Sequence, residues 1–158
     1  MDRLSKVRRS AIMSRIRGRG NKQTELNIIS LFRKSGIKGW RRHKTIHFVF
    51  GKLREGKASD GTKFKPQVRP DVLFPKLKVA LFIDGCFWHG CPDCYRRPKS
   101  RIGFWRRKVT RNRERDRFQR LELKREGWRV MQIWEHEVAA SPERCVRRIQ
   151  KALQKKKT

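Results

Sequence analysis

The chain has 158 residues, of which 44 are Lys or Arg and 14 are Asp or Glu, so its formal net charge is +30. This length fits one domain with a single core, and no apolar stretch reaches the roughly 20 residues needed to span a bilayer. A charge of this size repels itself in the folded state and indicates a polyanionic partner. Nucleic acid is a better candidate for that partner than an anionic membrane surface.

Residues 1–20 are polar and strongly basic. They predict either a helix or arm that lies on phosphates or a solvated tail. They lack the apolar segment of an export signal, so we expect a cytoplasmic protein associated with nucleic acid. Residues 21–158 predict a single domain, whose first helix begins at Thr24–Glu25 and ends near Gly36.

Three short strands are predicted next. Residues 41–50 alternate apolar and polar side chains, which is typical of a strand. Residues 51–67 are rich in Gly, Lys and Asp without periodicity, and predict a hairpin loop or an insertion. Apolar runs at 71–74 and 79–83, separated by a turn at 75–78, predict a β-hairpin.

The second half predicts a long charged helix at 101–126, a strand at 128–134 and a final helix that begins at Ser141-Pro142-Glu143. Because a helix connects the strands at 79–83 and 128–134, a right-handed crossover would make these strands parallel. The sequence therefore predicts an α/β fold with a central mixed β-sheet flanked by helices.

Three cysteines follow the strand at 79–83 with C-x4-C-x2-C spacing: Cys86, Cys91 and Cys94. In a chain without a secretory signal, this spacing favours structural zinc over disulfides. Zinc requires a fourth ligand, and we favour His136 because its strand should run beside the strand that leads into the loop. The other candidates are His89, Cys145 and Asp93.

Two aspartates lie at strand ends. Asp71 begins one strand of the predicted hairpin and Asp84 ends the other. Carboxylates on neighbouring strands can hold Mg²⁺ together with water and phosphate oxygens, although a strand-end Asp can also simply cap a turn. In a chain with so few acids, carboxylates on a phosphate-binding face are unfavourable unless a cation bridges them to the nucleic acid.

His89 lies in the same loop. A histidine beside a metal-bound phosphate can take a proton from water or supply one to the leaving oxygen; the alternative is a fourth zinc ligand. Glu25 either orients His89 or is an ordinary acid in a first helical turn. Phe87, Trp88 and Trp105 predict a base-stacking surface or, alternatively, packing around the loop.

These residues resemble the very short patch repair (Vsr-type) DNA mismatch endonucleases. The resemblance covers most of the chain, and the central segment and the Trp-Glu-His segment are its most specific parts. The matching segments are Arg9–Ile16 with Thr24-Glu25, Arg69-Pro70-Asp71, Phe82–Pro92, Phe104-Trp105, Asn112–Asp116, and Gly127-Trp128 through Ile133–Glu137.

The resemblance implies a restriction-endonuclease-like three-layer fold and Mg²⁺-dependent nicking of one DNA strand, 5′ to the thymine of a T·G mismatch left by deamination of 5-methylcytosine. It implies that Asp71 and the Ile83 backbone carbonyl bind Mg²⁺, and that His89 is the acid/base group, with Glu25 as its partner and Asp116 in support. Asp84 stands where the family has Asp or His, and the implied zinc ligands are Cys86, Cys91, Cys94 and His136. The resemblance also implies that wedges enter the base stack, namely Phe87, Trp88 and Trp105, and that Met13 in the N-terminal arm grips the opposite groove.

The chain departs from the family pattern in its longer segment before Asp71 and in its high charge. A relative that nicks paired DNA in a homing or defence system, with partner proteins from such a system or from mismatch repair, is therefore an alternative. A non-catalytic basic zinc protein that binds nucleic acid is another. The expected partner is double-stranded DNA, bound by a monomer.

Overall fold

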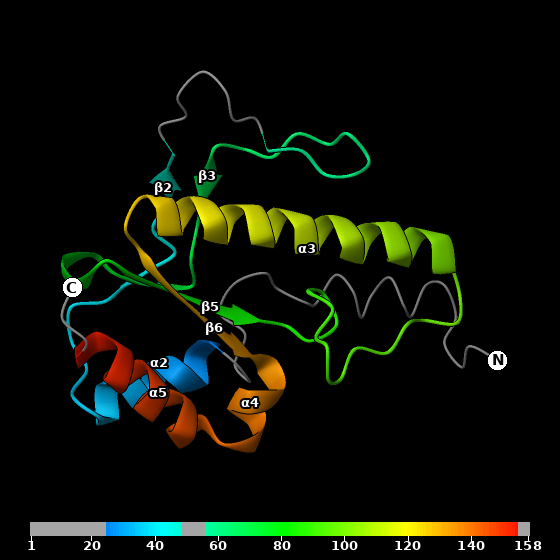
Figure 1. Cartoon of the computed structure of the whole chain (residues 1–158). Coiled ribbons are helices and arrows are strands. Elements are labelled where there is room, and N and C mark those ends of the chain that lie inside the picture. The colour runs from blue at the N-terminus through cyan, green and yellow to red at the C-terminus, as the bar shows by residue number, and fades with distance from the viewer. Residues whose placement is uncertain (1–24, 49–55, 155–158) are drawn as a thin grey trace.

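The structure is a computed structural model that describes residues 25–48 and 56–154. The predicted arm at 1–20, including Met13, lies outside these residues. Helix α3 (Ile102–Arg125) lies on one side of the central sheet, and α2 (Glu25–Lys34) and α5 (Pro142–Gln154) lie on the other (Figure 1). The predicted mixed sheet with helices on both faces is confirmed. Among the described helices, none is long and apolar enough to cross a membrane.

The central sheet has the strand order β1-β4-β5-β6. Strands β4 (Val72–Phe74) and β5 (Val79–Asp84) form the predicted antiparallel hairpin, joined by the short 3₁₀ helix Pro75–Leu77. Strand β6 (Arg129–Trp134) pairs in parallel with β5, as the crossover rule predicts. The register sets Asp84 opposite Trp134, so the loop after β5 and the segment after β6 begin at the same edge of the sheet.

The prediction of one strand over residues 41–50 is wrong. Two short strands lie there in different sheets: β1 (Arg41–Arg42) pairs with β4, and β2 (Ile46–His47) pairs with β3 (Gln67–Val68). His43 separates β1 from β2 with a left-handed φ of 50°, which breaks the extended backbone. Strands β2 and β3 are antiparallel. Of the predicted loop at 51–67, residues 51–55 lie outside the described residues, Lys57 and Lys63 form an isolated bridge, and Gln67 already belongs to β3.

Side chains of β5 alternate between two cores. Val79 and Leu81 pack with residues of α2 and α5, whereas Ala80 packs with Leu123 of α3. Successive side chains of a strand point to opposite faces, so Asp84 lies on the same face as Ala80, toward α3. This alternation places Asp84 on the α3 side of the sheet.

A helix that the sequence did not predict, α4 (Glu135–Ala140), begins directly after β6. A Glu137 carboxylate oxygen accepts a hydrogen bond from the Trp134 backbone N–H at 2.7 Å, which fixes the change from strand to helix. His136 is therefore held in the first turn of α4, at the edge of the sheet where the loop after β5 begins.

Candidate active site and metal centre

Four side chains converge where β5 and β6 end. The Sγ atoms of Cys86, Cys91 and Cys94 lie 3.3, 3.6 and 3.4 Å from Nδ1 of His136. Bond lengths of about 2.3 Å to sulfur and about 2.0 Å to nitrogen give a tetrahedral zinc site edges of about 3.5 Å, so these separations fit zinc. The four ligand atoms form one group that can hold a metal ion, and Cys145 and His89 do not belong to it.

The backbone of the loop supports this cluster. The Cys86 N–H donates to a Glu135 carboxylate oxygen at 3.1 Å, and the Cys91 N–H donates to the Cys86 carbonyl at 2.8 Å. Gly90 has a φ of 62°, and a Cβ at this position would lie 2.6–2.7 Å from side-chain atoms of Arg113 and Val109. The loop thus packs closely on α3, and a larger residue at position 90 would separate them.

Replacing Cys91 with serine should remove most of the bound zinc and lower the unfolding temperature by several degrees. Cys91 is buried, and binding of a structural metal contributes directly to folding free energy. The measurement is zinc per chain by mass spectrometry, with thermal unfolding. Cys145→Ser is the matched control, because it alters another buried cysteine and should leave the zinc content unchanged. Full zinc retention in Cys91→Ser would contradict the assignment.

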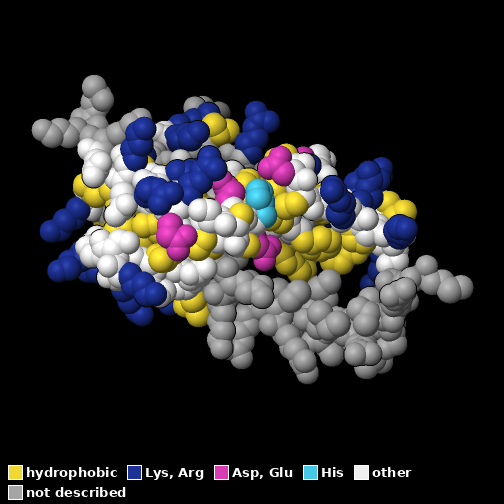
Figure 2. All heavy atoms as spheres, turned by 90° about the horizontal axis from the view of Figure 1, so that it is seen from below, with side chains coloured by type: hydrophobic (Ala, Val, Ile, Leu, Met, Phe, Trp, Pro, Cys, Tyr) yellow, Lys and Arg dark blue, Asp and Glu magenta, His cyan; other side chains and the backbone are white. Residues whose placement is uncertain are grey.

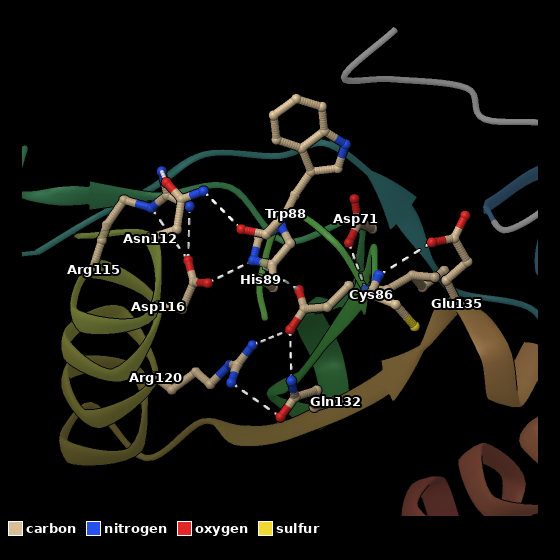
Figure 3. Close-up of polar contacts among 12 residues, drawn as sticks. Asp71, Cys86, Trp88, His89, Asn112, Arg115, Asp116, Arg120, Gln132 and Glu135 are labelled. Carbon is tan, nitrogen blue, oxygen red and sulfur yellow. Dashed lines mark hydrogen bonds and ion pairs between the residues drawn. The ribbon is translucent and has the colours of Figure 1, made fainter. Parts of the chain in front are cut away.

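His89 is held by α3. Its Nδ1 lies 2.5 Å from Oδ2 of Asp116 and 3.7 Å from Oδ1 of Asp84 (Figure 3). Arg115 donates to the other Asp116 oxygen at 2.8 Å. Asn112, one turn before Asp116, donates to the Trp88 carbonyl at 2.8 Å, which fixes the backbone next to His89. The ring is therefore positioned from both sides.

Burial would lower the pKa of His89, but the hydrogen bond that its Nδ1–H donates to Asp116 and the charges of Asp84 and Asp116 together raise it above the usual value. Burial alone would raise the pKa of Asp116, and its contacts with His89 and Arg115 lower it instead. Asp116 thus stays ionised and binds Nδ1–H, which leaves Nε2 of His89 as the nitrogen that can exchange a proton with a substrate.

Asp84 belongs to this side of the site. Its Oδ2 accepts hydrogen bonds from Arg120 and, at 2.7 Å, from Gln132. Desolvation raises the pKa of its buried carboxyl group, while the charges of His89 and Arg120 act against this. These two donors occupy Oδ2, while Oδ1 lies 3.7 Å from Nδ1 of His89. That Asp84 joins Asp71 around a cation stays a prediction.

Asp71 lies just before β4, and its Oδ2 accepts a hydrogen bond from the Ile83 N–H at 2.7 Å. Within a strand, the N–H and C=O of one residue point to the same side, so the Ile83 carbonyl also points toward β4. The pairing of β4 with β5 ends at Val72 and Leu81, so the Ile83 backbone lies beyond the ladder, beside the Asp71 side chain. The Asp71 carboxylate and the Ile83 backbone therefore lie side by side, and a cation shared by Asp71 and the Ile83 carbonyl stays a prediction.

Desolvation raises the pKa of Asp71 to about 6, and the nearby charges of Glu25 and Asp84 add to this against the Ile83 hydrogen bond. Several negative groups around a half-buried carboxylate are unfavourable without a positive charge. The electrostatics thus favour either a proton or a metal ion at Asp71.

The expected pairing of Glu25 with His89 is wrong. Glu25 Oε1 accepts a hydrogen bond from Arg42 Nε at 2.7 Å and lies 2.9 Å from Nε2 of His43. Asp116 takes the place beside His89 that was predicted for Glu25. Glu25 starts α2 on the Asp71 side of the site, so it belongs with the predicted metal ligands rather than with the histidine.

The predicted aromatic residues form one cluster. Phe87 lies with its ring centroid 5.2 Å from that of Trp88 and 4.9 Å from that of Trp105. Their side chains are half-buried against each other, and the neighbouring Phe104 is 51% exposed. The Trp88 indole points away from the polar network around His89 (Figure 3). Their insertion into a base stack stays a prediction.

A hollow of about 400 Å³ lies beside His89, between the loop and α3. Its lining is basic as well as acidic, since α3 contributes arginines at positions one turn apart. Its charged and titratable lining residues are Asp84, His89, Arg113, Asp116, Arg117 and Arg120. Figure 2 shows acidic side chains and a histidine together in the middle of one face, with Lys and Arg side chains around them. This arrangement can attract a phosphate to an acid/base group.

Sequence comparison gives relatives with a named activity. Residues 60–96 match the profile of a family described as DNA mismatch endonuclease Vsr. The chain is 35% identical over 140 residues to the type II nicking enzyme V.XorIIP of Xanthomonas oryzae pv. oryzae, which covers 87% of each chain. It is 43% identical over 109 residues to the type II nicking enzyme V.NaeI of Lentzea aerocolonigenes, covering 66% of this chain and 63% of that one.

A third relative is the DNA mismatch endonuclease Vsr of Escherichia coli, 41% identical over 69 residues, which covers 42% of this chain and 44% of that enzyme. A histidine–aspartate pair beside a half-buried carboxylate, in a chain with these relatives, defines the class: the protein is a DNA endonuclease. More narrowly, the chain belongs to the Vsr-type endonuclease family.

The roles of Asn112, Arg120, Gln132 and His43 were not predicted. Asn112 and Arg120 lie four residues before and after Asp116, which was predicted, and all three point to one side of α3. The helical periodicity of polar residues could therefore have indicated Asn112 and Arg120. Gln132 lies on the same face of the sheet as Asp84, which strand alternation could have shown. His43 carried no such signal, because it lies within the segment that was predicted as a regular strand.

Proposed function

We propose that the protein uses Mg²⁺ to nick one strand of duplex DNA 5′ to the thymine of a T·G mismatch, on a restriction-endonuclease-like three-layer fold. The observation that carries the proposal is the His89–Asp116 pair at 2.5 Å, in the same site as the Asp71 carboxylate and the Ile83 backbone. The likeness to the E. coli DNA mismatch endonuclease supports a mismatched duplex as the substrate.

Asp71 and the Ile83 carbonyl would hold the cation, which would stabilise charge on the scissile phosphate and activate water. Asp116 keeps the His89 Nδ1 protonated and fixes the ring plane. Nε2 of His89 then takes a proton from the attacking water or gives one to the leaving oxygen. Arg113 and Arg117 of α3 line the adjacent hollow and attract the DNA backbone.

The cysteine cluster would have a structural role. We infer that zinc bound by Cys86, Cys91, Cys94 and His136 joins the loop after β5 to α4, so that His89 is held between two fixed cysteines. Phe87, Trp88 and Trp105 would enter the base stack beside the mismatch, where aromatic side chains act as wedges.

The test compares two labelled duplexes that differ only in one pair, T·G or T·A, within randomised flanking sequence, each with Mg²⁺ or EDTA. The proposal expects a Mg²⁺-dependent nick in the T strand of the T·G duplex alone. Equal nicking of both duplexes would instead favour a nuclease of paired DNA. Binding without any nick would favour a non-catalytic role.

A further inference from the structure

Three side chains from three different elements meet on the Asp71 side of the site. They are Glu25 at the start of α2, His43 after β1 and Asp71 before β4, and one ligand atom from each lies within 4.8 Å of the others. The group contains two carboxylates and one imidazole. The roles proposed above use Asp71 but give none to His43.

The backbone holds His43 against Asp71. Its N–H donates to the Asp71 carbonyl at 3.2 Å, directly after the pairing of Arg42 with Val72 between β1 and β4. His43 has a φ of 50°, a left-handed conformation that is uncommon for residues other than glycine. Such strain persists where the surrounding structure determines it, and it often occurs at functional sites.

The imidazole nitrogen that faces the carboxylates lacks a hydrogen bond. Nε2 of His43 is buried and lies 2.9 Å from Oε1 of Glu25, yet within the described parts of the chain it makes no hydrogen bond of acceptable geometry. An unsatisfied buried nitrogen costs free energy. A buried imidazole nitrogen without a hydrogen bond, in a group whose carboxylate and imidazole ligand atoms lie within 4.8 Å of one another, fits a metal ligand.

Arg42 provides a hydrogen-bond partner for the Glu25 carboxylate but none for the His43 imidazole. The Arg42 guanidinium donates to Glu25 Oε1, through Nε at 2.7 Å and also through Nη2. Such a contact orients a ligating carboxylate in the way that supporting residues do around metal sites. It gives His43 Nε2 no acceptor or donor, so an ion pair between Arg42 and Glu25 does not explain the position of the ring.

We propose that His43 is a direct ligand of the divalent metal at Asp71, together with Glu25, and that this centre binds Mn²⁺ more tightly than Mg²⁺. The proposal rests on the metal site of the proposed function and extends its ligand set. Mg²⁺ prefers oxygen ligands alone, whereas affinity for nitrogen donors increases among the transition metals. Mn²⁺ accepts carboxylate oxygens and tolerates one imidazole, which matches this group of ligands.

The test uses the full-length, zinc-loaded protein without DNA. Binding of Mn²⁺ is measured by loss of the free-ion EPR signal, in competition with Mg²⁺, and ¹⁴N modulation in pulsed EPR reports an imidazole on the bound ion. We expect ¹⁴N modulation in the wild type and none in His43→Ala. Mn²⁺ affinity should fall about tenfold or more in that variant, and Mg²⁺ affinity should change much less.

Two matched variants identify the nitrogen. His89→Ala and His47→Ala should keep the ¹⁴N modulation, and circular dichroism checks that each variant is folded. The proposal is overturned if the wild type shows no modulation or binds no Mn²⁺, or if the modulation disappears in His89→Ala and persists in His43→Ala. Because no DNA is present, a failure of T·G specificity would leave this result unaffected, and Mg²⁺-dependent nicking without ¹⁴N modulation would overturn the His43 proposal alone.

Discussion

Replacing His89 with alanine should slow strand nicking by about a hundredfold to ten-thousandfold, the range that a positioned acid or base contributes. His89 is the group that Asp116 holds at 2.5 Å beside the basic hollow, and no other described histidine lies in that lining. The measurement is the single-turnover nicking rate on a T·G duplex with saturating Mg²⁺.

DNA binding separates chemistry from recognition in this variant. His89→Ala should bind the duplex with nearly wild-type affinity in Ca²⁺, since the arginines of α3 that line the hollow are unchanged. His47→Ala is the matched control, because His47 is exposed on β2, and its nicking rate should be unaltered. A His89→Ala enzyme that nicks at close to the wild-type rate would refute the acid/base role.

Asp71→Asn should abolish Mg²⁺-dependent nicking and yet stabilise the metal-free protein at pH 8. The asparagine can keep the hydrogen bond from the Ile83 N–H but supplies no charge to a cation. The gain in stability arises because burial raises the pKa of Asp71 to about 6 in the folded state. The variant therefore exchanges activity for stability, as is common at active sites.

The sign of this effect follows from proton linkage. The folded protein binds a proton at Asp71 more readily than the unfolded chain does, so ionised Asp71 costs stability above pH 6. The gain in Asp71→Asn should be about 1–3 kcal/mol at pH 8, since one pKa unit corresponds to about 1.4 kcal/mol. It should fade as the pH falls from 6 toward 4, and Mg²⁺ should reduce it by stabilising only the wild type.

Chemical denaturation at pH 8 and pH 4 measures this difference. Asp60→Asn is a suitable control, because Asp60 is exposed and its hydrogen bonds with Thr62 lower the pKa instead. That substitution should not raise stability at pH 8 and should leave nicking unchanged. If Asp71→Asn is less stable than the wild type at pH 8 without metal, burial does not raise the pKa of Asp71 and its ionised form does not destabilise the folded protein.

The apparent affinity for Mg²⁺ should depend on the protonation state of the Asp71 carboxyl group. Below pH 6 a proton competes with the cation at Asp71, so the apparent affinity for Mg²⁺ should fall by up to about tenfold per pH unit.

Much of this site follows from sequence patterns with a direct geometric meaning. The spacing of Cys86, Cys91 and Cys94 predicts a ligand cluster, and the parallel crossover predicts that His136 lies beside it, because parallel strands end at one edge of the sheet. The β4–β5 hairpin likewise predicts that Asp71 lies near the end of β5. These features follow from the residue spacing within each segment and from the way the strands are connected along the chain.

The remaining features depend on side-chain direction. Glu25 and Asp116 are both acids within reach of the site, and only the packing of α3 on the loop decides that Asp116 contacts His89. The left-handed turn at His43 broke a pattern that predicts a continuous strand, and so placed an imidazole near Asp71. Neither outcome can be read from the alternation of polar and apolar residues.

The central claim is that Asp116 acts through His89 on one phosphodiester, and a double-mutant cycle of single-turnover nicking rates on the T·G duplex tests it most directly. The account predicts that Asp116→Asn slows the wild-type enzyme about tenfold or more but has almost no further effect in the His89→Ala background, because groups that act as a unit are non-additive. Losses that multiply in the double variant would show that Asp116 and His89 act independently, and would contradict the account.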